Sequence, residues 1–140
     1  MIQRIQSIWL LLAGLAATAM LKFPLWKGTL GNAADRAVTG SSYLPLFLLI
    51  AMTALVGFGA IFFFKDRKTQ KALCWLGMLL SLFLLFLEYM RAASLQRTAA
   101  YQGSWQLSAA LPIIIFVLFI MARSGIRKDE KMLRSLEKLR

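Results

Sequence analysis

The sequence contains no histidine, a single cysteine and only six acidic residues among 140. Without histidine, the commonest general base and metal ligand of proteins is missing. A lone cysteine excludes a framework of internal disulfide bonds. Charged residues make up 16% of the chain and hydrophobic residues 59%. Soluble domains have about 25% charged and 45–50% apolar residues, so these values exclude a disordered chain and disfavour an ordinary soluble one.

The shortage of catalytic side chains also bears on function. Cys74 has no visible base partner, and no glycine-rich phosphate loop occurs in the sequence. Acidic residues are absent from the middle of every apolar stretch, where a buried catalytic acid would be expected. We therefore expect a protein that is not an enzyme and that uses no cofactor and no metal.

Four long apolar stretches are present, and they account for the mean hydropathy of +0.66. A membrane-spanning helix needs about 20 mainly apolar residues, because the hydrocarbon core is about 30 Å thick. The expected spans are residues 5–22, 43–64, 72–90 and 105–123, followed by a tail of residues 124–140. The predicted fold is an all-α, integral membrane four-helix bundle in a single domain.

Two other interpretations of these stretches were weighed. A soluble four-helix bundle would need a polar stripe on each helix, which these stretches lack. Arg4, an apolar run and the small residues Ala17-Thr18-Ala19 are also compatible with a signal peptide. Because the apolar run continues into Met20 and Leu21, we expect the first stretch to be a retained membrane span.

The basic residues predict the orientation in the membrane. Twelve of the 17 lie before the first span, between the second and third, or after the fourth, and five lie in the other two connections. Cytoplasmic segments carry the excess of lysine and arginine, so both termini are expected in the cytoplasm. The predicted location is the bacterial cytoplasmic (inner) membrane. This orientation explains the net charge of +11, and nucleic acid is not an expected partner.

Small residues spaced four apart mark surfaces where helices can approach closely. The pairs are Ala13 and Ala17, Gly14 and Thr18, Thr53 and Gly57, and Gly77 and Ser81. They predict close helix packing, within one chain or in a homo-oligomer.

The two outer connections differ in composition. Residues 22–42 contain proline, glycine and small polar residues, which predict a flexible connecting segment. Residues 90–104 begin with a run rich in alanine, leucine, glutamine and arginine, which predicts a helical extension of the third span.

The tail has the pattern of an amphipathic helix. Apolar residues occur at positions 126, 132, 133, 136 and 139, and basic residues occupy the other face. Such a helix beside a bilayer can bind anionic headgroups or an acidic partner, or it can simply be solvated. The sequence alone does not decide whether it lies on the membrane or extends the fourth span.

One acidic residue lies close to the interior of a span. Glu88 is about one turn inside the outer end of the third span, and Lys22 lies at a similar depth at the end of the first. Arg91 is three residues after Glu88, within reach of an ion pair on one helix. We expect Glu88 to pair with Arg91 or Lys22. The alternative is that Glu88 is a proton or cation site near the outer mouth of a small oligomeric transporter or channel.

Three segments resemble a known family: MIQRIQS at residues 1–7, FKDRKTQKALC at 64–74, and IRKDEKMLRSLEKLR at 126–140. Over the whole chain, the sequence resembles the domain-of-unknown-function family 4293, which comprises small four-helix membrane proteins of the Bacteroidota. Asp66 stands where asparagine is usual in that family, and Glu137-Lys138 where Asp-Arg is usual. The resemblance implies a cytoplasmic-membrane protein and brings no established biochemical role.

All three segments are expected on the cytoplasmic side. This leads to the hypothesis of a scaffold or accessory subunit whose basic cytoplasmic face binds a protein partner or anionic lipid. The residues expected to make this contact are Gln3, Arg4, Gln6, Arg67, Lys68, Lys71, Arg127, Lys128, Lys131 and Arg134.

Overall fold

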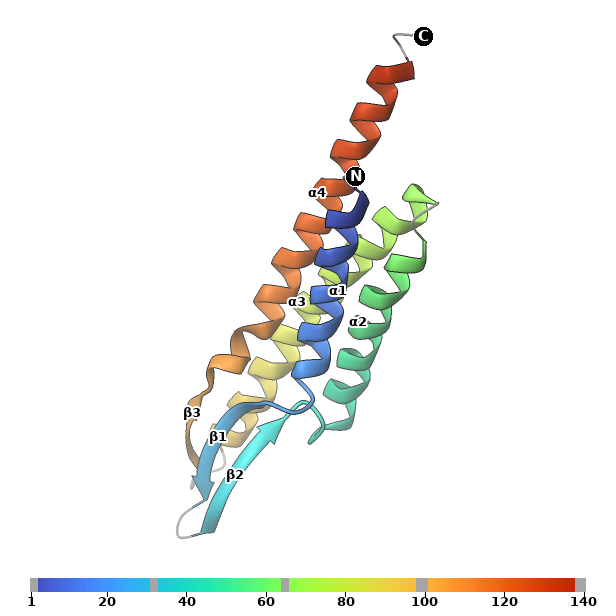
Figure 1. The fold of residues 1–140 in the computed structure, drawn as a ribbon. Coiled ribbons are helices and arrows are strands. Elements are labelled where there is room, and N and C mark those ends of the chain that lie inside the picture. Colours follow the sequence, from blue (N-terminus) through green and yellow to red (C-terminus); the bar gives the residue numbers. More distant parts are fainter. Residues whose placement is uncertain (1–2, 31–32, 64–65, 98–100, 138–140) are drawn as a thin grey trace.

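Four α-helices run side by side along the molecule (Figure 1). The computed structural model describes residues 3–30, 33–63, 66–97 and 101–137. The helices are α1 (Gln3–Ala19), α2 (Leu44–Phe62), α3 (Arg67–Arg97) and α4 (Leu111–Glu137). Both α1 and α3 contact α2 and α4, so α1 and α3 are diagonal partners. The predicted helical bundle is confirmed.

Three of the helical segments are long and apolar enough to cross a membrane: Leu44–Phe62, Arg67–Arg97 and Leu107–Ser135. The apolar part of α1, Ile5–Ala19, is shorter. The 17 residues of α1 span about 25 Å at 1.5 Å per residue, slightly less than the hydrocarbon core of a bilayer. The 31 residues of α3 extend well beyond one membrane thickness, and its last turns follow the predicted extension through residues 90–97.

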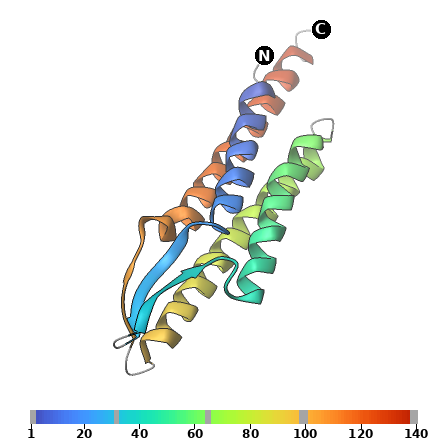
Figure 2. The ribbon, with the colours of Figure 1, turned by 60° about the horizontal axis from the view of Figure 1, so that its bottom comes forward.

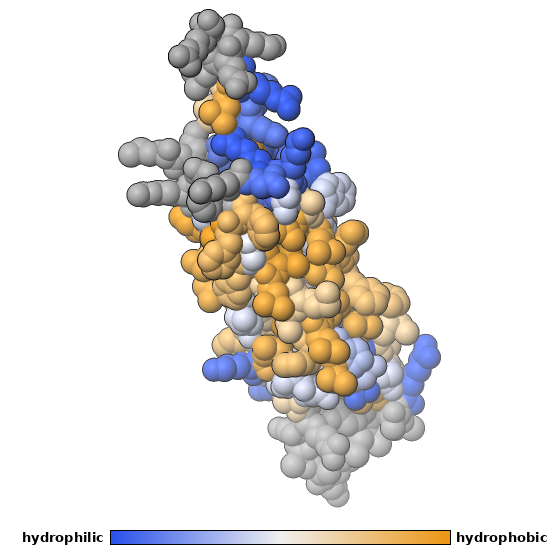
Figure 3. All heavy atoms as spheres, turned by 90° about the vertical axis from the view of Figure 1, so that its right-hand side faces the viewer, coloured by the Kyte–Doolittle hydropathy of each residue, from blue (hydrophilic) through white to orange (hydrophobic). Residues whose placement is uncertain are grey.

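Large apolar side chains cover the outside of the bundle. Leu55 is 70% exposed and Phe62 81% exposed, and many more leucine, isoleucine and phenylalanine side chains are exposed on all four helices. Figure 3 shows them as a broad apolar zone between two more polar ends. Soluble monomers rarely expose continuous apolar patches larger than a few hundred Å². This surface is suited to contact with lipid chains.

A small antiparallel sheet lies at the end of the bundle opposite the start of α1 (Figure 2). It consists of β1 (Pro24–Leu30), β2 (Ala33–Thr39) and β3 (Tyr101–Trp105), in the order β2-β1-β3. The prediction of a flexible segment over residues 22–42 was therefore wrong, because β1 and β2 form a hairpin there. The helical extension predicted over 90–104 ends at Arg97, and β3 pairs with β1 instead.

The sheet is tied to the bundle by three hydrogen bonds. The Gly40 amide donates to the Met20 carbonyl over 3.0 Å, and the Gln106 amide donates to the Leu25 carbonyl over 3.1 Å. The Ser108 hydroxyl, in the short 3₁₀ helix η1 (Leu107–Ala110), donates to the Pro24 carbonyl. Leu25 itself is fully buried in the core. The sheet thus closes this end of the bundle.

The small residues predicted to allow close packing lie where helices meet. A Cβ atom added to Gly57 would lie 3.0 Å from the backbone nitrogen of Gly14, so α1 and α2 approach through these two glycines. On the other side of the bundle, a Cβ added to Gly77 would lie 2.4 Å from the ring of Phe119 in α4. Phe119 is fully buried, which leaves its ring little room to move.

The glycine contacts give a stability prediction. We expect Gly77→Ala to lower the free energy of unfolding by about 1–3 kcal/mol, because the new methyl group forces the Phe119 ring out of a packed site. The matched control is Gly59→Ala, because Gly59 has nothing within 4 Å of an added Cβ. There the higher helix propensity of alanine adds up to about 1 kcal/mol of stability. Thermal unfolding of both variants in one detergent measures the difference, and equal melting temperatures would contradict the packing described here.

Candidate functional site

Polar side chains connect the helices at one end of the bundle. This end contains the start of α1 and the α2–α3 connection. The Gln6 amide in α1 donates to the carboxylate of Asp129 in α4, and both side chains are buried. Lys71 in α3 donates to both carboxylate oxygens of Glu130 in α4, over 2.9 and 2.7 Å. The Gln70 amide donates to the Ala60 carbonyl of α2 over 3.2 Å. These bonds connect all four helices.

The polar connections change the predicted contact face. Gln6 was expected to meet a partner, but its side chain is buried between helices, because Asp129 and the close approach of Gly125 hold it there. Lys71 is about one-quarter exposed and forms an ion pair with Glu130. The side chains of Gln6 and Lys71 therefore bind other helices of the same chain. The side chains of Gln3 and Arg4 lie outside the described residues.

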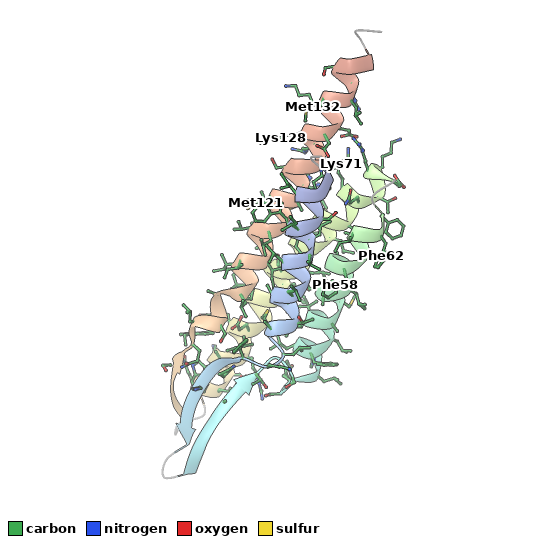
Figure 4. The ribbon with its side chains drawn as sticks, viewed as in Figure 1. Phe58, Phe62, Lys71, Met121, Lys128 and Met132 are labelled. Carbon is green, nitrogen blue, oxygen red and sulfur yellow. The ribbon has the colours of Figure 1, made fainter. Side chains whose placement is uncertain are left out.

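The remaining predicted residues form the basic tail face, which we define as Arg127, Lys128, Lys131 and Arg134 of α4. All four side chains are exposed. Lys68 is also exposed, on the neighbouring start of α3, and Arg67 is half-buried. Figure 4 places Lys128 on α4 close to the level of Lys71. The structure thus brings the loop and tail residues to the same end of the molecule.

The tail is a direct continuation of the apolar part of α4. α4 runs without interruption from Leu111 to Glu137, and its last turns project past the end of α1 (Figure 1). Residues 131–135 are all exposed. Met132 and Leu133 are among them, and a shallow hollow of about 400 Å³ is lined by Lys128, Lys131, Met132 and Ser135. The tail therefore extends the predicted fourth span as one continuous helix.

A second unusual group lies toward the opposite end. Glu88 is only 4% exposed, and neither of its carboxylate oxygens has a hydrogen-bond partner among the described residues. The predicted ion pair with Arg91 or Lys22 is therefore not formed. The Arg91 guanidinium lies 4.9 Å from the centre of the Tyr43 ring, where a cation–π contact replaces the ion pair, and Lys22 is exposed.

Chemistry of other kinds has little support in the described part of the chain. No group of three or more histidine, cysteine, aspartate or glutamate side chains lies close enough to hold a metal ion there. Cys74 is a free thiol that is buried in the apolar core. The features that remain are the basic tail face and the isolated Glu88.

The α2–α3 connection is stabilised by a helix cap. The Asp66 carboxylate accepts hydrogen bonds from the Lys68 amide over 3.1 Å, from the Thr69 amide over 3.4 Å and from the Thr69 hydroxyl over 2.5 Å. Aspartate and asparagine are both favoured at this position, because their side-chain oxygen accepts from free amides of the first turn. The hydrogen bond from the Thr69 hydroxyl is the main cause that lowers the pKa of Asp66.

Sequence reasoning missed two partners at this site. Asp129 and Glu130 lie in the tail, and the predicted contact residues included neither of them. Their bonds to Gln6 and Lys71 cross 123 and 59 residues of sequence. No local pattern reports contacts over such separations. The one available signal was that Asp129 lies one helical turn after Gly125, a small residue.

The cap predicts a pH dependence. A carboxyl group whose pKa is lower in the folded chain stabilises the fold above its unfolded pKa of about 3.9, and this stabilisation is lost as the pH falls through the folded pKa. We expect the melting temperature of the wild type to fall relative to Asp66→Asn between pH 6 and pH 3, because asparagine caps the helix without titrating. Asp66→Ala should melt lower than both at pH 6. Parallel melting curves for wild type and Asp66→Asn at every pH would contradict the cap.

Comparisons with known proteins give one positive result. No curated protein and no solved structure matches the chain significantly. The family described as "Domain of unknown function (DUF4293)" matches residues 2–139, which is nearly the entire sequence. The match includes all four helices, the sheet and the basic tail face. The chain therefore belongs to the DUF4293 family.

Proposed function

We propose that the protein is a non-enzymatic integral protein of the bacterial inner membrane that acts as a scaffold or accessory subunit. In this proposal both termini are cytoplasmic, and the basic tail face is the contact surface. The apolar surface of the bundle supports the membrane location. The orientation is supported by the basic residues, because 12 of the 17 lie in the segments predicted on the cytoplasmic side. The short α1 would lie in the bilayer beside α2 and α4.

One observation carries the proposal. Between residues 124 and 135 the tail contains two acidic residues, Asp129 and Glu130, and both bind side chains of other helices. The exposed side of the helix from Arg127 to Arg134 is therefore basic, although the sequence of the tail is of mixed charge. A surface of one sign attracts an oppositely charged partner and rejects others of its own sign.

The direction of the tail favours a protein partner over lipid. An amphipathic helix that binds headgroups lies in the plane of the interface. Here the helix continues the axis of a spanning segment, so its last turns point away from the apolar zone (Figures 1 and 3). The exposed Met132 and Leu133 add apolar area beside the charges. We therefore propose an acidic protein segment with apolar side chains as the ligand of this face.

The test compares two sets of neutralised residues. The tail variant is Arg127→Gln, Lys128→Gln and Lys131→Gln. The matched control is Lys22→Gln, Lys27→Gln and Arg97→Gln, which removes three exposed charges at the other end of the bundle. Crosslinking in native membranes should give a partner that the tail variant captures roughly tenfold less well, if each charge contributes about 0.5 kcal/mol. The control should capture it at the wild-type level.

Two results would contradict this proposal. Equal capture by wild type and tail variant would exclude the basic tail face as the contact. Binding of the purified protein to vesicles of anionic lipid, with no captured protein that depends on these three residues, would assign the face to lipid. Equal expression and melting temperature of the three forms show that the fold is unaffected.

A second candidate, from another class, is a small oligomeric transporter or channel. What favours it is the buried carboxyl group of Glu88, because ionisable groups at membrane depth often serve transport. The centre of the bundle is filled by apolar side chains such as Leu10, Ile50 and Phe119. A path would therefore have to run between copies of the chain. Proton or cation flux into vesicles that contain the wild type, and its loss in vesicles that contain the Glu88→Gln variant, would support this candidate.

A further inference from the structure

A hollow of about 630 Å³ opens beside Glu88. It lies between α3 and the segment that joins η1 to α4, and Trp105 at the end of β3 forms part of its wall. Its other walls include Phe86, Tyr89 and Ile113. These side chains are all about half exposed, so the hollow is open to the apolar outer surface of the bundle. Its size is within the range of small-molecule sites, about 300–1,000 Å³.

Of the described residues that line this hollow, Glu88 is the one with a charged side chain. Only 4% of it is exposed, and within the described part of the chain both of its oxygens lack a partner. Buried polar atoms in native proteins are almost always hydrogen-bonded, and an unpartnered one is costly to keep. A leucine at this position would pack against the surrounding apolar side chains without burying an unpartnered polar group. Glu88 thus adds unused acceptor capacity to the wall of an otherwise apolar hollow.

The surroundings limit the chemistry of an occupant. A molecule that enters from the lipid-facing side must itself be dissolved in the membrane. A carboxyl group accepts hydrogen bonds through at least one oxygen in either protonation state, so the matching group on the occupant is an N–H or O–H donor. Tyr89 and Trp105 are side chains of the kind that lie at the level of lipid headgroups.

We propose that this hollow binds a membrane lipid whose head carries a hydrogen-bond donor. The ammonium or hydroxyl group of the head donates to the Glu88 carboxyl group. The acyl chain lies along Phe86 and Ile113, toward the middle of the apolar surface. This site is separate from the basic tail face, and it does not require the function proposed for that face.

The experiment uses the full-length protein in nanodiscs of phosphatidylcholine, to which one test lipid is added. Phosphatidylcholine has no donor on its quaternary ammonium group. Phosphatidylethanolamine offers an ammonium N–H, and diacylglycerol offers a hydroxyl. The readouts are the melting temperature and the lipid that stays bound, measured by native mass spectrometry after extraction in detergent. We expect each donor lipid that fits to raise the melting temperature and to be retained at least tenfold more than phosphatidylcholine.

Three variants separate binding from folding. Glu88→Leu removes an unpartnered buried group, so this variant should melt at or above the wild-type temperature in detergent. It also removes the hydrogen-bond acceptor, so retention of the donor lipid should fall roughly tenfold, as expected for a lost hydrogen bond to a charged group. Ala110→Trp fills the hollow and should reduce retention while Glu88 is kept. Ser81→Ala, at a buried polar position of the same helix, is the control and should retain lipid like the wild type.

The outcomes assign or reject the site. A response to phosphatidylethanolamine alone assigns an ammonium head, a response to diacylglycerol alone assigns a hydroxyl head, and a response to both assigns the shared donor. Equal retention of phosphatidylcholine and the donor lipids would overturn the proposal. Unchanged retention of the donor lipids by Glu88→Leu would also overturn it. A third contrary result is a wild-type dimer that retains no lipid and that Ala110→Trp dissociates, because the hollow would then be covered by a second copy of the chain.

Discussion

The position of α4 depends on two polar contacts, and much of the molecule depends on the position of α4. Asp129 binds Gln6 of α1, and Glu130 binds Lys71 of α3, on consecutive residues that point to two different helices. Together they fix the rotation of α4 about its axis, because a rotated helix would leave a buried carboxylate unpaired at a cost of several kcal/mol. That rotation decides which side chains of the tail are exposed. The basic character of the tail face is thus a consequence of the packing of Asp129 and Glu130, which lie between Lys128 and Lys131 in the sequence.

The two ends of the bundle differ in how their buried polar residues are partnered, although the Asp129 Oδ1 and Arg123 Nε atoms also lack a hydrogen-bond partner among the described residues. At the end near the α2–α3 connection, Gln70 and Gln6 have partners on neighbouring helices, and Arg123 lies 4.5 Å from the centre of the Trp75 ring. At the other end, Glu88 has none, although Arg91 lies one turn away on the same helix. Arg91 instead contacts Tyr43 of α2. The helix contact is therefore made at the expense of the local ion pair, which leaves the carboxyl group available for another ligand.

The parts of the fold that could be predicted are those that depend on local composition. Apolar runs located the ends of α1 and α2 to within about three residues, whereas α3 and α4 extend well beyond the apolar runs that predicted them. Small residues four apart indicated the contacts at Gly57 and Gly77. The sheet was missed because β2, with the sequence AADRAVT, has few strand-forming residues. It is held by pairing with β1, whose other edge binds β3 some 75 residues further along, as Trp26 opposite Trp105 illustrates. The two-residue Gly31-Asn32 connection was the local hairpin signal.

Glu88 shows why the candidate sites were harder to predict than the fold. From its spacing alone, an ion pair with Arg91 was the simplest expectation, and it failed because Tyr43 of another helix competes for the guanidinium. The hollow beside Glu88 is made by α3, η1, α4 and β3 together, so no segment of sequence reports it. Stable bundles do not need an unpartnered carboxyl group in an apolar wall, and local rules of this kind are most often broken where a protein binds something. The same reasoning applies to residues 127–134 of the tail: their charge pattern is mixed in sequence, and their exposed side is basic because Asp129 and Glu130 bind other helices.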